Sequence, residues 1–413
     1  MLLKQFPGLN NLVPYQTFNL AGDLTAGIVV TFLLLPQSMA YAMIAGVPLS
    51  MGLIAGTFPL MIYVLIGSSK YLSVGPASVV SLLAFTGVSG VTGPGSEQFL
   101  EMMVFLVLLV GLIQLVLGLL KVGSLLGKVS RAVIGGFISA VAIIIMLNQL
   151  SSFLGITLPK YENFLSFIFN LIQNLSDVNV LATSFGIGSM IVLLLFKKRF
   201  KVSPGPFIVI VISILAVDFL NLNKMGVDIV GRIPHEFQEI ALFIPSSDIL
   251  ITLLPTAIII SFISFFESFS VASTLADKEM EKINPNQELM GLGFANITGS
   301  FVGSIPVAGA ISRTAVNYQA GARTNLSLVI TASFMLLAIF YITPLFYYLP
   351  QATLAGIIIF AVWNLVNVKQ LKHLLKYEPF DAVIFLMTLF ATLVVDVFVG
   401  LIIGIALSLW KKR

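Results

Sequence analysis

The sequence predicts an all-α membrane protein that crosses the bilayer many times. Of its 413 residues, 58% are hydrophobic and only 10% are charged, whereas soluble domains carry about 25% charged residues. The apolar residues fall into long runs, many near the length of about 20 residues that spans a bilayer. Positive charges collect on alternate connections between these runs. A soluble enzyme is therefore excluded, and we expect no enzymatic activity.

Fourteen apolar segments are predicted, seven on each side of a polar connector. Residues 1–22 form a cytoplasmic or interfacial lead-in, 23–222 a first repeat, 223–247 an extracytoplasmic connector and 248–413 a second repeat. The predicted segments cover about residues 24–45, 49–67, 76–88, 98–120, 129–153, 179–196, 205–222, 249–275, 288–301, 310–319, 325–347, 349–366, 379–394 and 398–410.

The distribution of positive charge supports this count. Of the 22 Lys and Arg residues, only Lys160, Lys224 and Arg232 fall on predicted outer segments. Lys and Arg concentrate on the cytoplasmic side of membrane proteins, so we expect an even number of spans and both termini in the cytoplasm. With seven spans in each half, the second half enters the membrane in the opposite orientation, which makes an inverted repeat.

Two of the segments are interrupted in the same way. Residues 303–314 (GSIPVAGAISRT) break at Gly303 and Pro306, and residues 73–81 (SVGPASVVS) break at a Gly-Pro pair. Each break precedes a short helix whose N-terminus carries unsatisfied N–H groups and partial positive charge. Paired breaks in the two halves predict a transporter binding site, and two such N-termini predict an anion site.

Arg313 and Glu267 are the charged residues expected at membrane depth. A cation at the position of Arg313 is costly and usually functional, so we favour a direct role in anion binding over a permanent ion pair with Glu267. Glu267 lies inside segment 249–275, where desolvation favours the protonated form. We interpret it as a proton carrier, with a structural anchor among nearby serines as the alternative.

Gln37 and Tyr41 lie four residues apart in the first segment and therefore share a helix face. They either line a cavity or hydrogen-bond between helices. Small residues such as Gly111 are expected to permit close helix packing. The chain has no cysteine and two histidines in polar connections, so no metal, cofactor or catalytic site is expected.

Several motifs resemble the SulP family of anion transporters, which includes sulfate permeases and solute carrier family 26. They are residues 35–42 (LPQSMAYA), 45–48 (AGVP), 67–76 (GSSKYLSVGP), 286–289 (NQEL), 291–293 (GLG), 312–313 (SR) and 320–324 (AGART). Because they occur in the family's order over nearly the full length, the resemblance is specific.

The resemblance implies fourteen segments in two inverted repeats of seven. A core domain, here about 23–122 and 248–347, would carry the anion, and a gate domain, about 123–222 and 348–413, would stay in place during an elevator movement. The third and tenth segments are half-helices, preceded by short extended segments. Members are usually dimers, so a homodimer is expected.

The resemblance also places the site between the two half-helices and the first and eighth segments. An acidic residue at the position of Glu267 couples transport to a cation in bacterial relatives, and a glutamate indicates protons. The expected anion-binding residues are Gln37, Tyr41, Ala77, Ser78, Ala310, Ser312 and Arg313, with Glu267 as the proton-coupling residue.

The sequence departs from the family at two points. Ala77 stands where many relatives have an aromatic residue, which widens the expected site. Relatives usually continue into a cytoplasmic STAS domain, so we interpret this chain as the transmembrane domain without it, whether that domain was removed or is naturally absent.

We therefore expect a proton-coupled symporter of a small inorganic anion, with sulfate favoured, in a bacterial inner or cytoplasmic membrane. Alternatives are a sodium- or proton-driven bicarbonate carrier, a dicarboxylate or nucleobase carrier, an uncoupled anion channel or a membrane scaffold. The expected partners are the anion, a coupling proton or sodium ion, membrane lipids and a second copy, and no nucleic acid.

Overall fold

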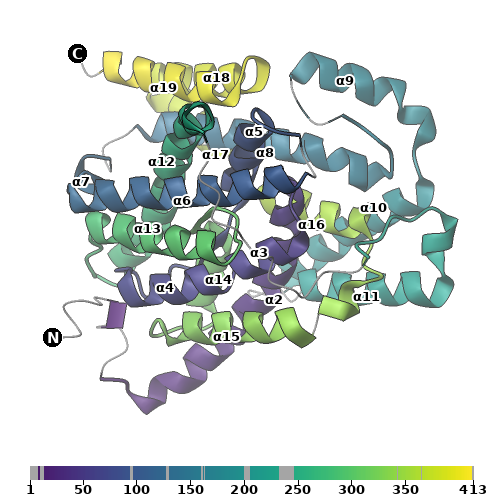
Figure 1. The fold of residues 1–413 in the computed structure, drawn as a ribbon, viewed down its shortest axis with the longest axis horizontal. Coiled ribbons are helices and arrows are strands. Elements are labelled where there is room, and N and C mark those ends of the chain that lie inside the picture. The colour runs from purple at the N-terminus through teal and green to yellow at the C-terminus, as the bar shows by residue number, and fades with distance from the viewer. Residues whose placement is uncertain are drawn as a thin grey trace. The chain divides into compact units, whose positions relative to one another are not determined.

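The computed structural model is mostly helical (Figure 1). It describes residues 8–9, 14–93, 96–126, 130–159, 161, 163–199, 205–231, 246–341, 343–363 and 365–411. Much of the predicted lead-in 1–22 and of the predicted connector 223–247 therefore lies outside the described residues.

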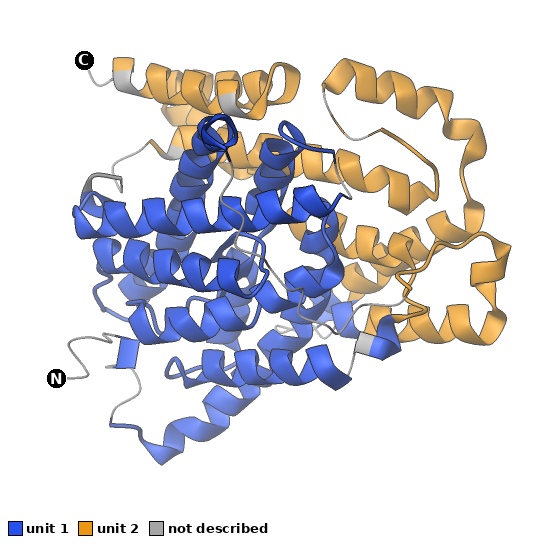
Figure 2. Ribbon diagram, in the orientation of Figure 1, with its two compact units in different colours: residues 1–127, 196–207, 232–346 blue, residues 128–195, 208–231, 347–413 orange. Residues whose placement is uncertain are grey.

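The chain forms two compact units (Figure 2). Unit 1 comprises Met1–Gly127, Phe196–Phe207 and Arg232–Phe346, and unit 2 comprises Lys128–Leu195, Ile208–Gly231 and Tyr347–Arg413. Each unit thus draws on both halves of the sequence, as two interleaved structural repeats would require.

Unit 1 is a packed group of helices around a two-stranded ribbon. Helix α13 lies between α4 and α6, and α15 packs along α2 (Figure 1). The helices are α2 (Leu20–Ala45), α3 (Leu49–Ala55), α4 (Phe58–Ile66), α5 (Ser78–Ser89), α6 (Glu97–Leu119), α7 (Gly123–Leu126), α12 (Ser247–Lys278), α13 (Pro285–Phe301), α14 (Ile311–Gln319) and α15 (Leu326–Tyr341).

Glycines let α6 and α13 approach closely. A Cβ atom at Gly111 would lie 2.8 Å from the carbonyl oxygen of Gly293, and one at Gly293 would lie 2.9 Å from that of Gly111. Real Cβ atoms do not come so near, so each glycine makes room for the other backbone, as small residues do between membrane helices. The packing role expected for Gly111 is confirmed.

Unit 2 contains the remaining long helices. Helices α16 and α18 pack on α8, and α19 packs on α18. The helices that lie wholly or mainly in this unit are α8 (Arg131–Leu154), α9 (Phe164–Gln173), α10 (Val180–Arg199), α11 (Gly205–Leu220), α16 (Gln351–Trp363), α17 (Val368–Tyr377), α18 (Pro379–Val394) and α19 (Val397–Lys411).

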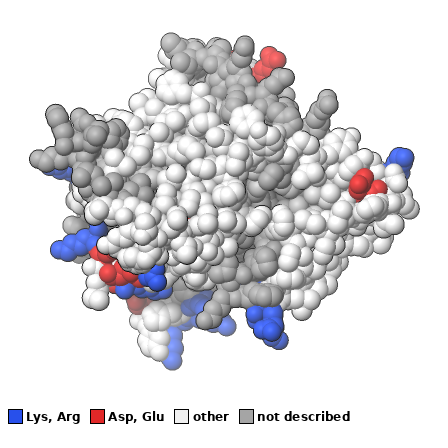
Figure 3. All heavy atoms as spheres, turned by 90° about the horizontal axis from the view of Figure 1, so that it is seen from below, with Lys and Arg blue, Asp and Glu red and all other residues white. Residues whose placement is uncertain are grey.

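Among the described residues, seven helical stretches are long and apolar enough to cross a membrane, and shorter apolar helices accompany them. Two of the seven each join two of the helices named above, α3 with α4 and α16 with α17. Figure 3 shows a broad face with few charged side chains, which gather toward its margins. The prediction of a mostly helical membrane protein is confirmed at this level. The count of fourteen spans and the inverted repeat stay predictions.

The structure differs from the predicted segments at 49–67 and at α7, α9 and α17, which lie outside all fourteen segments. The segment predicted at 49–67 is broken into α3 and α4, and Pro59 lies in the first turn of α4. Helix α3 ends at Ala55 and α4 begins at Phe58, so Pro59 falls in a first helical turn, where its missing N–H leaves no hydrogen bond unmade. Helix α17 was not predicted, because its lysines interrupt the apolar run that marks a span.

A two-stranded antiparallel ribbon lies at the two sequence breaks. Strand β1 (Val74–Pro76) pairs with β2 (Val307–Gly309), with Gly75 opposite Ala308. Each strand leads into a short helix, β1 into α5 and β2 into α14. The short extended segments expected before the two half-helices are present, and they pair with each other.

Buried polar side chains hold the segments that flank this ribbon. Glu288 is fully buried and accepts hydrogen bonds from Tyr63 Oη (2.8 Å), Ser68 N (2.7 Å), Ser68 Oγ (2.6 Å) and Ser69 N (3.1 Å). These bonds fix the chain that leaves α4 and enters β1. The start of the first half-helix therefore depends on a carboxylate from α13.

Replacement of Glu288 by alanine should destabilise the protein. Four donors would lose their acceptor, and each unpaired buried donor costs about 1–3 kcal/mol. We expect the thermal unfolding midpoint in detergent to fall by about 10 °C. Glu97→Ala, at an exposed site in the first turn of α6, is the control and should cost less than about 1 kcal/mol. Equal midpoints for the two variants would contradict this role.

Candidate functional site

The two half-helices both begin without a capping side chain. Ala77 is the N-cap of α5 and Ala310 is the N-cap of α14, and neither can accept a hydrogen bond through its side chain. Ser, Thr, Asn or Asp usually fill this position and satisfy one N–H of the first turn. Both first turns thus keep N–H groups that an external acceptor could use.

The ribbon brings these two helix starts together. Val74 lies opposite Gly309 and Pro76 opposite Val307, and Ala310 N donates to Ser73 O at 3.2 Å. Three residues of strand span only about 10 Å. The positive ends of two helix dipoles therefore lie on one short ribbon, an arrangement that favours a bound anion.

Arg313 adds a full positive charge at the same place. Its side chain is fully buried, and Nη1 donates to Gln37 Oε1 at 3.2 Å and to Pro76 O at 3.0 Å. Nε and Nη2 have no hydrogen-bond partner among the described residues. A buried charge is costly unless it is paired, so the free edge of this guanidinium is suited to a negatively charged ligand.

Gly75 makes room for the guanidinium. A Cβ atom at this position would lie 3.2 Å from Arg313 Nη2 and 3.4 Å from a methyl carbon of Leu34. The Gly-Pro pair that marks the break in the sequence thus has two functions, since glycine admits the arginine side chain and Pro76 supplies a carbonyl oxygen to it.

Glu267 lies on α12 and is nearly buried, with 8% of its surface exposed. Its Oε2 atom has no hydrogen-bond partner in the described part of the chain. The neighbouring serines do not anchor it, because Ser264 and Ser268 hydroxyls donate to main-chain oxygens of α12. Glu267 and Arg313, both described, are close enough to interact electrostatically but form no hydrogen-bonded ion pair.

Gln37 and Tyr41 come from α2 and are both buried. Gln37 orients Arg313 through its amide oxygen. The hydroxyl of Tyr41 lies beside Ser78, within electrostatic range of both Arg313 and Glu267. The bond from Arg313 to Gln37 joins α14 to α2, so Gln37 forms a hydrogen bond between helices, which was one of its two expected roles. The cavity-lining role of Gln37 and Tyr41 stays a prediction.

All eight residues expected at the site belong to unit 1. Ala77, Ser78 and Ala310 are buried at the helix starts, whereas Ser312 is exposed in the first turn of α14. The structure thus places seven of the expected side chains in the interior and leaves Ser312 open.

Sequence reasoning missed the polar residues that hold β2. Val307 N donates to Asn296 Oδ1 (2.9 Å), and Asn296 Nδ2 donates to Gln114 Oε1 (2.9 Å). Gln114 Nε2 donates to Ser264 Oγ (2.6 Å), and Gly309 N donates to Ser268 Oγ (2.7 Å). A single amide within an apolar run, such as Gln114, was the available signal, since a buried amide must find partners.

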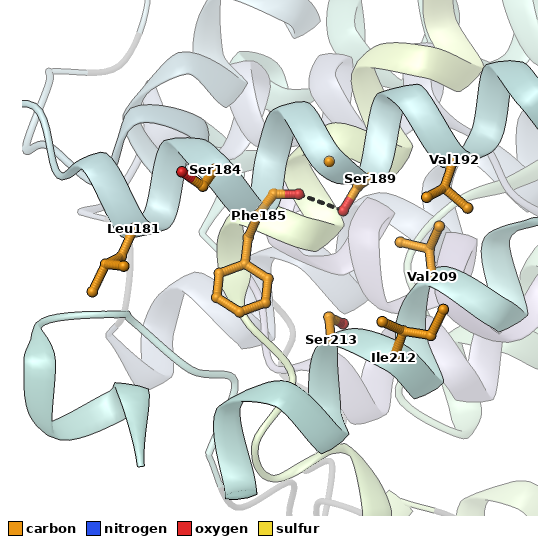
Figure 4. Close-up of a pocket in the computed structure, with 9 residues that line it drawn as sticks. Leu181, Ser184, Phe185, Ser189, Val192, Val209, Ile212 and Ser213 are labelled. Atoms are coloured by element: carbon orange, nitrogen blue, oxygen red, sulfur yellow. Dashed lines mark hydrogen bonds between the residues drawn. The ribbon is translucent and has the colours of Figure 1, made fainter. Parts of the chain in front are cut away.

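Unit 2 has a cavity of a different character (Figure 4). Its volume is about 270 Å³, and its polar side chains are serines, of which Ser189 donates to the Phe185 carbonyl at 2.6 Å. It is lined by Leu181, Ser184, Phe185, Gly188, Ser189, Val192, Val209, Ile212 and Ser213. With no charged side chain, this cavity is poorly suited to an inorganic anion.

The long apolar helices define a polytopic integral membrane protein, and its candidate site lies where the two half-helices meet on a ribbon. Residues 20–388 match the sequence profile of the Sulfate permease family. The chain belongs to this family.

Known proteins agree with this assignment. Sulfate transporter 4.1, chloroplastic, of Arabidopsis thaliana is 34% identical over 397 residues, which are 94% of this chain and 57% of that protein. The chain thus spans little more than half the length of this relative. The relatives that we compare are named as transporters and not as enzymes.

Two solved structures share the fold. The murine Solute Carrier 26 family member A9 anion transporter, in its inward-facing state, has a TM-score of 0.91 and 22% identity, over 98% of this chain and 70% of that chain. The transmembrane domain of the cyanobacterium bicarbonate transporter BicA has a TM-score of 0.81 and 24% identity, over 94% of this chain and 97% of that chain.

Capping α14 should weaken anion binding. In Ala310→Ser, the new hydroxyl would accept an N–H of the first turn and stabilise the helix by about 1 kcal/mol. The anion would lose that donor, so we expect the affinity for radiolabelled sulfate, measured in detergent, to fall about fivefold. Ser96→Ala is the control, because it removes a cap from α6, where Phe99 N donates to Ser96 Oγ. Unchanged affinity in Ala310→Ser would rule out the helix start as a ligand.

Proposed function

We propose that this protein carries a small inorganic anion across the membrane, with sulfate as the favoured substrate. The observation that carries the proposal is the buried guanidinium of Arg313, whose Nε and Nη2 are unpaired beside two uncapped helix starts. The sulfate transporter relative supports this choice of substrate. A tetrahedral oxyanion can accept hydrogen bonds from a guanidinium and from main-chain N–H groups at the same time.

Glu267 is proposed to couple transport to protons. Its partly unpaired carboxylate lies near enough to Arg313 for their charges to interact. Moving net charge through a membrane is costly, and a proton on Glu267 would compensate one negative charge of the anion. The free energy of crossing would then be lower for the doubly loaded site than for the anion alone.

Unit 1 is proposed to be the moving core and unit 2 the gate. All eight expected site residues lie in unit 1, so the anion would travel with one compact body, as elevator-type alternating access requires. We further propose fourteen spans in two inverted repeats, a homodimer, both termini in the cytoplasm, and a bacterial inner or cytoplasmic membrane as the location.

Bicarbonate is the second candidate substrate, with sodium or protons as the driving ion. The specific observation is the shared fold with the transmembrane domain of BicA, which this chain covers almost completely. Ala77, the N-cap of α5, has a small side chain and does not by itself discriminate between the two anions.

Uptake into proteoliposomes tests the proposed activity. We expect radiolabelled sulfate to accumulate when the outside is acidic and to equilibrate without accumulation when no gradient is present. Accumulation that follows a sodium gradient instead, or uptake of bicarbonate without sulfate, would replace the substrate or the coupling ion. Sulfate currents that ignore both gradients would indicate a channel.

Glu267→Gln should separate binding from coupling. The amide keeps the size of the side chain but cannot take up a proton, so sulfate affinity should stay within about threefold while proton-driven accumulation is lost. Asp277→Asn is the matched control, since it makes the same change at an exposed position of α12, about 15 Å further along the helix. Normal accumulation by Glu267→Gln would exclude a coupling role.

Substitutions of Arg313 test the anion site itself. Arg313→Gln removes the charge and should lower sulfate affinity on the order of a hundredfold, because a charge-assisted hydrogen bond contributes about 1.5–3 kcal/mol. Arg313→Lys keeps the charge but not the planar set of donors, so we expect an intermediate loss. Arg323→Gln, at an exposed arginine ten residues away, should bind sulfate normally, and equal losses at the two positions would count against a specific site.

A further inference from the structure

Helix α17 (Val368–Tyr377) of unit 2 has lysines along one side. Lys369, Lys372 and Lys376 are exposed and stand three and four residues apart, which places them on one face of an α-helix. Residues 365–377 contain no acidic residue. This face therefore presents a row of positive charges, and the first carboxylate after it is that of Glu378, the C-cap of α17.

A second side of α17 is apolar, and only part of it is covered. Leu374 is buried and Leu371 is half-buried, whereas Val368 is 50% exposed and Leu375 is 57% exposed. On a helical wheel, Val368 and Leu375 lie between the protein-facing leucines and the lysine row. The helix thus has an exposed apolar strip directly beside its positive strip.

Two exposed aromatic side chains flank the helix, one before it and one at its end. Trp363, at the end of α16, is 66% exposed, and Tyr377, at the end of α17, is 61% exposed. Lys376 Nζ lies 5.0 Å from the centre of the Tyr377 ring. Trp and Tyr concentrate where a membrane meets water, because each has an apolar body and a polar edge.

We propose that α17 lies in the membrane interface and that its three lysines bind the phosphate groups of anionic phospholipids. An amphipathic helix with basic and apolar strips side by side inserts the apolar strip among the upper acyl chains. Its lysines then meet the headgroups, and they attract anionic lipids over neutral ones. Since α17 connects α16 to α18, the lipid would bind at the covalent link between two helices of unit 2.

The exposed apolar strip decides between a lipid and a free phosphate ion. Free phosphate would satisfy the lysines but would leave Val368 and Leu375 in water. A phospholipid satisfies both strips at once, because it joins a phosphate to an acyl chain. The observations therefore favour the lipid, and the experiments below separate the two sources.

The depth of α17 can be measured by site-specific labelling, because the chain has no cysteine. We would label Leu375→Cys and, as the matched control on the polar side, His373→Cys, each in the full chain reconstituted in nanodiscs. Lipids brominated on the acyl chain should quench the label at 375 about threefold more than the label at 373. Equal quenching at both positions, or none at 375, would overturn the interfacial position.

The choice of lipid is tested with a triple variant, Lys369→Gln, Lys372→Gln and Lys376→Gln. Glutamine preserves helix propensity, and the side chains are exposed, so the fold should persist. The preference for spin-labelled phosphatidylglycerol over phosphatidylcholine should fall by about tenfold to a hundredfold, because three lysines that attract anionic lipids are lost. The control neutralises Lys197, Lys198 and Arg199 of α10 instead.

The lipid preference of the two triple variants, and competition by inorganic phosphate, decide whether the proposal holds. The proposal is supported when only the α17 variant loses the preference and when inorganic phosphate does not displace the lipid. It is overturned when both variants lose the preference equally, when neither does, or when inorganic phosphate competes fully, since the lysines would then bind phosphate without a lipid.

Discussion

The pairing of two three-residue strands is the constraint on which the proposed site depends. β1 and β2 come from segments more than 200 residues apart in the sequence, and each ends where a half-helix begins. The ribbon is the contact that holds the N-termini of α5 and α14 next to each other. Asn296 and Ser268 hold β2, while Glu288 holds the chain that enters β1. Buried hydrogen bonds thus give the ribbon a rigid setting.

The charges around the ribbon are incompletely paired, which supports the proposed anion site. A buried arginine with two unpaired donors and a buried glutamate with an unpaired oxygen both raise the free energy of the empty protein. A direct ion pair would relieve both, yet Nη1 of Arg313 turns to Gln37 and Pro76 instead. Unsatisfied groups of this kind are retained where function requires them, which is the physical link between the geometry and the proposed anion transport.

The chain belongs to the Sulfate permease family and shares its fold with two solved transporters. Both findings agree with the proposal that this geometry serves transport. The units divide the work that we propose between them, with the charged site in unit 1 and an uncharged apolar cavity in unit 2. Helix α17 adds a positive strip to unit 2. If this strip binds anionic lipids, as proposed, the lipid composition of the bilayer acts on unit 2, which contains none of the expected anion-binding residues.

The sequence by itself determined the class of protein, most helix positions and the two breaks, because long apolar runs and closely spaced glycine and proline residues are local signals. It also identified Arg313 and Glu267, since charges inside apolar runs stand out. It did not predict α17, whose pattern is that of a surface helix, or the break between α3 and α4. Only the tertiary structure paired β1 with β2, turned Arg313 toward Pro76 rather than Glu267, and assigned Gln114 and Asn296 their partners. Those contacts join residues distant in sequence, and hydrophobic periodicity carries no information about which distant polar groups will meet.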